Sequence, residues 1–364
     1  MEDKIKNKNS QTPKSITFVL PGFIKIPMGG VKVVNRLAEL LSRRGHKIAL
    51  IFPMQLSTGL LYKTKKMLIS LFDNISGVEK KLYYTPAAKV NALVVKDIRT
   101  KYIPEGDFVV AVGWQTAEAV QKLPKIHGEK IYFLQSFESY FNNSKKIINT
   151  YHYPMKKIAI AQWIVDELEK IGESAFGPTG NAINRNEFFE IENHPKTIDV
   201  MMMYHPAKIK SPKFGIKVLE AMKKQNSNFE ATIVAPRKPI HKIPDWINVY
   251  IRPNPEELCR LYNSSKVYFH PSIWEGWGLP PMEAMACGCS VVAVKNKGIS
   301  EYLIHEQNSL LISLNTQEAV EKISKLLTNI EYRKKIIKSG QEILDNYSEE
   351  RITLHFENFF LNNY

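Results

Sequence analysis

Residues Val267–Ile312 alternate strand-like and helix-like segments and read VYFHPSIWEGWGLPPMEAMACGCSVVAVKNKGISEYLIHEQNSLLI. The apolar, β-branched run at Val267–His270 predicts a buried strand. Pro280 and Pro281 follow a glycine-rich loop, and proline suits the first turn of a helix because the N–H that it lacks would have no partner there. A second buried strand is predicted at Ser290–Val294. This order of strand, loop, helix and strand is typical of a parallel α/β sheet.

The same alternation continues in both directions and restarts once, after the polar stretch Glu190–Thr197. Before that stretch, buried strands are predicted at Ile16–Leu20, Ile48–Phe52, Phe108–Val112, Ile131–Leu134 and Ile158–Ala161. After it, further strands are predicted at Val200–Tyr204, Ala231–Val234 and Val249–Ile251. Because no internal repeat of roughly 20–50 residues is present, the pattern predicts two Rossmann-like, doubly wound domains. Their ligand is expected in the cleft, at the carboxyl ends of the strands.

Four segments are expected along the chain. Residues 1–14 form a polar, disordered lead-in, residues 15–190 the first domain, and residues 191–345 the second. Residues 346–364 contain an amphipathic helix at Ser348–Phe360, which has the apolar face to pack back on the first domain.

Composition favours a cytoplasmic, globular protein. Apolar residues make up 44% of the chain, and no stretch approaches the ~18 uninterrupted apolar residues of a membrane-spanning helix. The polar N-terminus lacks the apolar core of a secretory signal. The three cysteines, Cys259, Cys287 and Cys289, lack metal-ligand spacing, which favours a reducing compartment.

Positive charge is concentrated in the first half of the chain. Lysine and arginine outnumber aspartate and glutamate by 11 in residues 1–190 and by 3 in the remainder. Such asymmetry favours an anionic partner, unless it only reflects a lysine-rich composition. The segment Leu60–Phe72, LLYKTKKMLISLF, either contacts anionic lipid or forms an ordinary surface helix. No recognition motif for nucleic acid accompanies the charge, so nucleic acid is not expected as a partner.

Two glutamates beside the predicted helix start suit a nucleotide-sugar ligand. A helix N-terminus offers free N–H groups to a diphosphate, and Gly276 and Gly278 let the backbone approach a ligand. Glu283, in the expected first turn, has the chemistry to accept two hydrogen bonds from a ribose diol. Glu275, in the preceding loop, has the chemistry to hold hydroxyls of the sugar. The alternative is that Glu283 only complements the helix dipole and that Glu275 is solvated.

Seven residues separate Glu275 from Glu283, within SxxEGxGLPxxEAMACG. This spacing resembles the E-x7-E signature of family 4 retaining glycosyltransferases, as do Gly298–Leu303 (G-x-x-E-x-[LI]) and the predicted strand Asn308–Ile312. The resemblance implies the GT-B fold, in which two Rossmann-like domains face each other across a cleft. It also implies that Glu275 contacts the donor sugar, that Glu283 contacts the ribose, and that the loop between them binds the donor through Gly276, Trp277, Gly278 and Leu279.

The two tryptophans that flank Glu275, Trp274 and Trp277, either line the sugar site or pack the cleft. MGGVKVVNRLAELLSRRGHKI, beginning at Met28, is similar to the family's first Gly-Gly loop and helix. That similarity implies that the amides of Gly29 and Gly30 face the donor phosphate or sugar, with a plain strand-to-helix turn as the alternative.

Two further segments, Gly113–Val120 (GWQTAEAV) and Tyr132–Phe141 (YFLQSFESYF), resemble bacterial rhamnosyltransferase-like enzymes of surface-glycan synthesis. Many relatives carry a histidine motif near the second segment, where this chain has Gln135 and Glu138. These two residues are acceptor-side candidates, or else they make structural hydrogen bonds at a strand end.

The diphosphate clamp departs from the family pattern. Relatives place an arginine and a lysine after the first strand of the second domain, whereas Tyr204–Gly215 (YHPAKIKSPKFG) has lysines at 208, 210 and 213. Lys213 matches the family lysine, and Lys208 stands in for the arginine without its bidentate fork. Arg237 is an alternative clamp, and a solvated basic loop is the alternative to any clamp.

The expected reaction is transfer of a sugar from a nucleotide diphosphate to a glycan or lipid-linked oligosaccharide, with retention of the anomeric configuration. The sequence has no D-x-D motif, no histidine pair at metal spacing and no P-loop, so neither a metal nor another cofactor is expected. Lys213, a second cation and the helix N-terminus would then stabilise the leaving diphosphate. Two other classes remain open: a nucleotide-sugar 2-epimerase or phosphorylase, and a degenerate binding module.

Overall fold

The first of two parallel sheets lies in the N-terminal half of the chain. The computed structural model describes residues 12–22, 29–54, 56, 89–138 and 144–362. The strands of this sheet are β1 (Ser15–Val19), β2 (Lys47–Pro53), β3 (Asn91–Val95), β4 (Phe108–Val112), β5 (Glu129–Leu134) and β6 (Lys156–Ala159). They pair in the order β3-β2-β1-β4-β5-β6, and every neighbouring pair is parallel.

The second sheet has the same architecture. Its strands are β7 (Ile198–Met203), β8 (Ala231–Ala235), β9 (Asn248–Ile251), β10 (Ser265–His270), β11 (Ser290–Val294) and β12 (Leu310–Ile312). They pair in parallel in the order β12-β11-β10-β7-β8-β9. The strand order reverses next to β1 in the first sheet and next to β7 in the second, and ligands of doubly wound sheets bind at such switch points.

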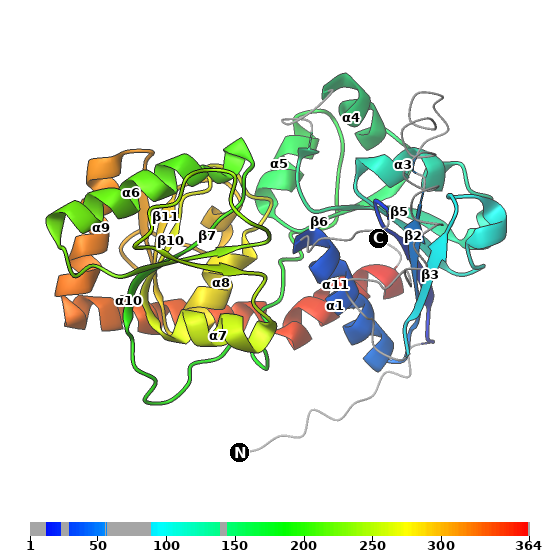
Figure 1. Cartoon of the computed structure of the whole chain (residues 1–364). Helices are drawn as coiled ribbons and strands as arrows, with labels where there is room; N and C mark the ends of the chain where they lie inside the picture. The colour runs from blue at the N-terminus through cyan, green and yellow to red at the C-terminus, as the bar shows by residue number, and fades with distance from the viewer. Residues whose placement is uncertain (1–11, 23–28, 55, 57–88, 139–143, 363–364) are drawn as a thin grey trace, which may run out of the picture.

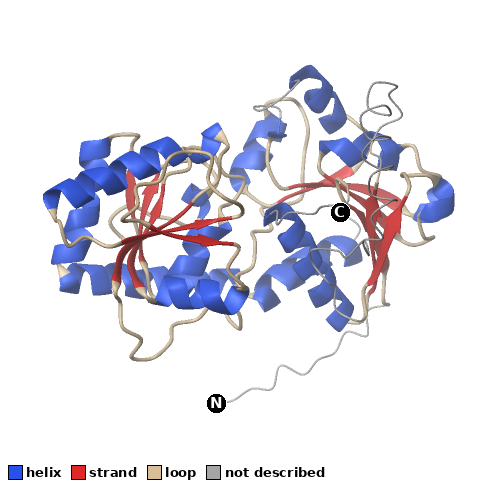
Figure 2. Cartoon of the chain, viewed as in Figure 1, coloured by secondary structure: helices blue, strands red, loops and turns tan. Residues whose placement is uncertain are grey.

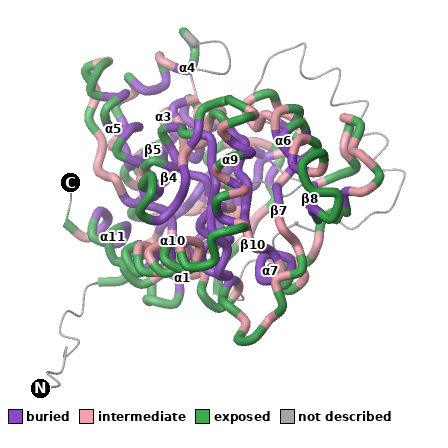
Figure 3. The backbone as a smooth tube through the Cα atoms, turned by 90° about the vertical axis from the view of Figure 1, so that its left-hand side faces the viewer, coloured by how far each residue is buried: buried purple, intermediate pink, exposed green. Residues whose placement is uncertain are grey.

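Helices cover both sheets, and the two domains lie side by side (Figures 1 and 2). In the first domain the helices are α1 (Gly29–Arg43), α3 (Trp114–Gln121), α4 (Ser144–Tyr151) and α5 (Gln162–Glu169). In the second they are α6 (Pro212–Gln225), α7 (Pro255–Asn263), α8 (Leu279–Ala286), α9 (Thr316–Thr328) and α10 (Ile330–Ile343). Figure 3 shows burial concentrated along the strands and exposed residues on the outer sides of the helices.

The C-terminal helix α11 (Glu349–Leu361) follows α10 of the second domain and packs on the first domain. The ring of Phe356 lies 5.0 Å from the ring of Phe133 on β5, edge to face. Arg36 on α1 donates to both carboxylate oxygens of Glu349, at 2.5 and 2.6 Å. An aromatic contact and a bidentate ion pair therefore tie α11 to the first domain.

The predicted strands agree with the structure, except that some of their ends differ by one or two residues and that one strand was not predicted. The strands β4 and β11 have the predicted bounds. The strand β3 was missed: it lies at the edge of its sheet, and four of its five residues are half-buried or exposed. The predicted lipid-contacting segment 60–72 and most of the polar lead-in lie outside the described residues. No helix that the structure describes is long and apolar enough to span a bilayer.

Candidate functional site

The first glutamate of the spaced pair is buried at the switch point of the second sheet. Glu275 lies in the loop after β10, and its side chain is only 10% exposed. Lys210, from the loop after β7, donates to both of its carboxylate oxygens at 2.7 Å. His270 Nε2 lies 3.2 Å from Glu275 Oε1. Burial raises the pKa of Glu275, but the charges and hydrogen bonds of Lys210 and His270 outweigh it and hold the pKa at about 2.

Further basic groups surround this carboxylate. The pKa of His205, just after β7, is lowered first by burial and then by the positive charges of Lys210 and Arg237, while Glu275 acts in the opposite direction. Arg237 follows β8. Basic groups that follow β7 and β8 and one that ends β10 therefore lie at the carboxyl ends of these strands, as an anionic ligand requires.

The two lysines predicted to form the clamp stand at the outer side of this cluster. Lys208 lies in a short 3₁₀ helix and Lys213 in the first turn of α6, and both are exposed. Neither contacts Glu275 in the described structure, where Lys210 takes that place. Lys208 and Lys213 thus remain predictions as phosphate ligands.

The second glutamate is held differently. Glu283 lies in the second turn of α8, not the first, because the helix begins at Leu279. Its Oε2 accepts a hydrogen bond of 3.2 Å from the hydroxyl of Tyr262. Its Oε1 lies 3.5 Å from the Nζ of Lys32 on α1 of the first domain. Burial raises the pKa of Glu283, and the charge of Lys32 only partly offsets this effect.

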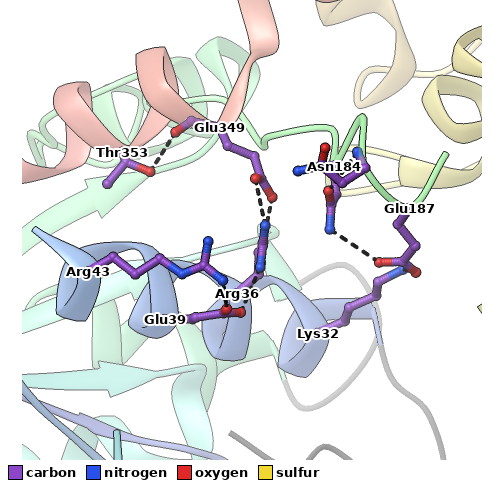
Figure 4. A network of polar contacts seen from close by, with 9 residues as sticks. Lys32, Arg36, Glu39, Arg43, Asn184, Glu187, Glu349 and Thr353 are labelled. Atoms are coloured by element: carbon purple, nitrogen blue, oxygen red, sulfur yellow. Dashed lines mark hydrogen bonds and ion pairs between the residues drawn. The ribbon is translucent and has the colours of Figure 1, made fainter. Parts of the chain in front are cut away.

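Lys32 also reaches a second carboxylate. Its Nζ lies 2.8 Å from Glu187 Oε1 and 4.8 Å from the centre of the Phe188 ring. Figure 4 shows Lys32 pointing from α1 toward the segment that carries Asn184 and Glu187.

A cavity of about 340 Å³ lies between α1, α11, residues 180–188 and the start of α8. Glu283, Lys32 and Glu187 are among its lining residues. This volume is at the lower end of the roughly 300–1,000 Å³ typical of small-molecule sites. The cavity therefore has room for part of a nucleotide beside Glu283.

Contacts within the protein by themselves require both glycines of the loop, and the expected approach of a ligand to them stays a prediction. A Cβ on Gly276 would lie 2.0 Å from the backbone oxygen of Gln135 in the first domain. Gly278 has φ +91°, and a Cβ there would lie 2.7 Å from a methyl group of Ile299. Gly276 therefore allows the two domains to touch, and Gly278 allows the turn into α8.

The predicted sugar-lining role of the Trp277 ring is not supported by its position. The ring is 3% exposed, stacks on Tyr302 and points its N–H toward the sulfur of Met282 at 3.0 Å. Trp274 instead meets Trp163 of the first domain edge to face, with ring centres 5.3 Å apart. Packing is thus the role that the structure gives to both rings. Leu279 lines the cavity beside Glu283.

The first-domain candidates take two different roles. Gln135 donates from Nε2 to the carbonyl oxygen of Gly30 at 3.2 Å, and so fixes the start of α1. Gly29 and Gly30 are the first residues of α1, so their N–H groups have no partner within the helix. Glu138 accepts a hydrogen bond of 3.2 Å from the backbone N–H of Trp114, and burial raises its pKa. Both contacts are structural hydrogen bonds, the alternative to an acceptor-side role: Gln135 holds the start of α1, and Glu138 holds the start of α3.

The two domains are joined by polar contacts close to the Glu275 loop. Trp163 on α5 donates from Nε1 to the carbonyl oxygen of Gly276 at 3.0 Å. Glu301 of the second domain accepts the backbone N–H of the same Trp163 at 3.1 Å, in the first turn of α5. Lys297 and Glu167 form an ion pair of 2.7 Å between the domains. In this structure the two domains therefore touch beside the site.

Sequence reasoning missed the two lysines that contact the glutamates. Lys210 was identified only as one of three lysines in a loop, and Lys32 was not identified at all. Residue type and spacing along the chain carry no signal for either, because Lys210 is 65 positions from Glu275 and Lys32 is 251 positions from Glu283.

Comparison with known proteins finds a family match in the second half of the chain. Residues 185–343 match the family described as glycosyl transferases group 1. An uncharacterized glycosyltransferase of Methanocaldococcus jannaschii is 28% identical over 153 residues, which cover 39% of this chain and 43% of that protein. The serotype-specific mannosyltransferase WbdA of Escherichia coli is 32% identical over 74 residues, which cover 20% of this chain and 9% of WbdA. The chain thus spans less than half the length of the curated relatives that it matches.

Solved structures resemble the whole chain. A sucrose-phosphate synthase of Thermosynechococcus elongatus has a TM-score of 0.70 at 15% identity, over 96% of this chain and 99% of that one. HepE of Anabaena, in complex with UDP-glucose, has a TM-score of 0.72 at 14% identity, over 95% and 98% of the two chains. The fold is therefore GT-B, as the sequence predicts, and the second of its two Rossmann-like domains carries the match to group 1 glycosyl transferases.

Proposed function

We propose that this protein is a retaining glycosyltransferase that moves a hexosyl or deoxyhexosyl group from a nucleotide-diphosphate sugar to a cell-surface glycan or lipid-linked acceptor. The observation that carries the proposal is the arrangement of Glu275 and Glu283 on one loop and helix of the second domain. Both carboxylates are buried, and the basic groups of three strand ends surround the first. This is a site for a ligand that combines hydroxyl groups with a diphosphate.

In this proposal the two carboxylates bind different parts of the donor. The Glu283 carboxylate, which borders the cavity, accepts hydrogen bonds from the ribose diol. Glu275, ionised at neutral pH because its pKa is about 2, accepts hydrogen bonds from hydroxyls of the sugar. Arg237, Lys213 and Lys208 lie at the strand and helix ends where the diphosphate would meet them. The N–H groups that begin α8 and α1 point to the same ligand.

The nature of donor and acceptor rests on relatives. HepE of Anabaena was solved with UDP-glucose, so UDP-sugars are the first donors to test. A matching protein of Escherichia coli is the O-antigen chain mannosyltransferase B, 43% identical over 47 residues, 13% of this chain and 12% of that protein. Together with the rhamnosyltransferase-like segments near Gln135, this supports a surface glycan as the acceptor. The positive first half of the chain suits an acceptor presented at the anionic inner face of the cytoplasmic membrane.

The proposed mechanism is displacement on the front face of the sugar. The bond between the anomeric carbon and the phosphate oxygen breaks, and its electrons go to the diphosphate. The acceptor oxygen forms its bond to the anomeric carbon on the same face, and its proton passes to the departing phosphate oxygen. Lys213, Arg237 and the helix N-terminus stabilise the negative charge that develops, the role that a metal ion has in other transferases.

The test of the donor site is binding without added divalent metal. Purified protein is titrated with UDP, dTDP, GDP and ADP and with their sugars, and thermal stabilisation and affinity are measured. We expect one nucleotide to stabilise the wild type and to bind markedly more weakly to Glu283→Gln. Glu331→Gln, on the exposed face of α10, is the matched control and should bind as the wild type does.

Two outcomes would contradict the proposal. A folded wild type that binds none of the nucleotides would leave a degenerate binding module with the GT-B fold. Mass spectrometry that finds the sugar covalently attached to a side chain during turnover would replace front-face displacement by a double-displacement mechanism.

A further inference from the structure

Lys32 on α1 stands between two carboxylates, Glu283 on α8 and Glu187, which lies just before the expected domain boundary at residue 190. Lys32 Nζ lies 2.8 Å from Glu187 and 3.5 Å from Glu283. Glu187 stays with the second domain because the residues after it are tied to α7. Asn263 donates to the carbonyl oxygen of Phe189 at 2.9 Å and accepts the N–H of Ile191 at 2.7 Å.

Three tyrosines and one cysteine near Glu283 have a raised pKa, whereas the pKa of Cys259, the hydrogen-bond partner of that cysteine, is lowered to about 6. Burial raises the pKa of Tyr262, Tyr268 and Tyr302 well above the usual value. The pKa of the Cys287 thiol is also raised, by its hydrogen bond with Cys259 and by burial. Among the described residues, Lys32 lowers the pKa of Glu283 through its positive charge, and Glu187 raises it through its negative charge.

We propose that Lys32 is a positioning residue that couples the nucleotide site to the approach of the two domains, by holding the Glu283 carboxylate between itself and Tyr262. When the domains touch, the ammonium group compensates the two neighbouring carboxylates. When the domains separate, Lys32 leaves with α1, and Glu187 and Glu283 face each other without it. Two like charges at short range then favour a proton on one of them.

The consequence is a donor site that is completed by domain contact. An ionised Glu283 accepts two hydrogen bonds from a ribose diol, whereas a protonated one loses the charge that strengthens them. When the cleft opens, one of the two carboxylates therefore takes up a proton, and the ribose contact weakens. When the cleft closes, the proton is released and the ribose contact is restored. This inference rests on the proposed function, because it assumes that Glu283 binds ribose.

The experiment is a charge-swap series in the full chain. UDP is titrated calorimetrically into the wild type, Lys32→Met, Glu187→Gln and the double variant at several pH values from about 5 to about 8.5, all above the ordinary glutamate pKa of about 4.3. The ratio of each variant's affinity to that of the wild type is compared at each pH, so that ionisation of UDP itself cancels. Thermal unfolding without UDP shows that each variant is folded.

We expect Lys32→Met to weaken UDP binding by about tenfold at pH 7, the effect of one pKa unit. The loss should shrink as the pH rises, because the carboxylate then ionises without the lysine. Glu187→Gln in the same chain should restore the affinity to within about threefold of the wild type, since it removes the like charge. Lys32→Arg, which keeps the charge, should bind UDP nearly as well as the wild type.

The result separates this inference from the proposed function. A wild type that binds UDP, together with a Lys32→Met variant of equal or higher affinity over the whole pH range, overturns the role of Lys32 and leaves the function standing. Failure of Glu187→Gln to rescue Lys32→Met also overturns it, because lost packing would not be repaired by removing a charge. A folded wild type that binds no nucleotide overturns both.

Discussion

Glu275 and Glu283 lie eight positions apart in one domain, and both are buried, but their surroundings differ. Glu275 is contacted by Lys210 and His270 of its own domain, and its pKa is held at about 2. Glu283 is contacted by Tyr262 of its own domain and, at a longer distance, by Lys32 of the other, and burial raises its pKa. The first carboxylate is preorganised within one domain, whereas the second depends on how the domains meet.

The difference teaches that burial alone does not decide the charge of a site carboxylate. Desolvation raises the pKa of both groups, so the nearest cation decides the outcome. A bidentate contact at 2.7 Å outweighs desolvation, and a contact at 3.5 Å shared with Glu187 does not. The charge at the sugar end of the proposed site is therefore constant, whereas the charge at its nucleoside end changes with the contact between the domains.

The largest expected effect tests the preorganised carboxylate. Lys210→Met leaves Glu275 with His270 alone, and we expect the free energy of unfolding at pH 7 to fall by about 2 kcal/mol, less than for a fully buried pair because Lys210 is partly exposed. Since the folded pKa of Glu275 lies below the unfolded one, its stabilisation is present above the unfolded pKa and is lost as the pH falls toward about 2. Urea unfolding of both proteins at several pH values measures this effect. The difference between the free energies of unfolding of the wild type and Lys210→Met should become smaller as the pH falls.

The matched control is Lys208→Met, an exposed lysine of the same loop. Its free energy of unfolding should change by less than about 0.5 kcal/mol. Equal losses for both lysine variants would show that the Lys210–Glu275 pair adds nothing special to the stability of the loop.

The next prediction distinguishes the two carboxylates by the ligand whose binding each of them affects. Glu283→Gln should weaken UDP and UDP-glucose equally, by about tenfold or 1.4 kcal/mol each. Glu275→Gln should leave UDP unchanged and weaken only the additional affinity of UDP-glucose, by a similar factor, because it removes a charge-assisted hydrogen bond to the sugar. Calorimetric titration of both ligands measures this, and a Glu275→Gln variant that weakens UDP itself would contradict the division of roles.

A smaller effect is expected from pH. Because burial raises the pKa of Glu283 above its ordinary value, UDP affinity should fall as the pH is lowered, and the fall should begin at a higher pH than the ordinary glutamate pKa of about 4.3 would give. The additional affinity of UDP-glucose should stay constant, since Glu275 remains ionised down to about pH 2. In Glu283→Gln the pH dependence of UDP binding should be reduced to that of UDP itself. If UDP affinity depends on pH in Glu283→Gln as it does in the wild type, Glu283 is not the cause of that dependence.

The smallest effect concerns the contact between the domains at the Glu275 loop. Trp163→Phe removes the hydrogen bond to the Gly276 carbonyl, and we expect a loss of about 1 kcal/mol in the free energy of unfolding. The additional affinity of UDP-glucose should fall slightly, while UDP binding should not. Trp246→Phe, in the second domain alone, is the control. If both variants lose the same stability and binding, the contact between the domains at Gly276 has no separate effect.

Much of the fold could be predicted because it depends on local patterns. The strands β4 and β11 are buried along their whole length and read as short runs of valine and alanine, so their bounds were recovered. The edge strand β3 was not predicted, although it contains the apolar run Ala92–Val95; only its last residue is buried. The residue pattern singled out the two glutamates and the glycines, but it gave no sign that a Cβ at Gly276 would collide with the backbone of Gln135 in the first domain.

The sequence by itself determined the order of strands and helices, the two Rossmann-like domains and the pair of glutamates on one loop and helix, while the resemblance to family 4 glycosyltransferases implied the GT-B arrangement. These features arise from residues within a few positions of one another, where hydrophobic period and turn chemistry act directly. Only the tertiary structure decided which cation faces each carboxylate. Lys210 and Lys32 are 65 and 251 positions from their partners, and such contacts depend on how sheets and domains pack. The charge of the proposed site is therefore a property of the packed molecule.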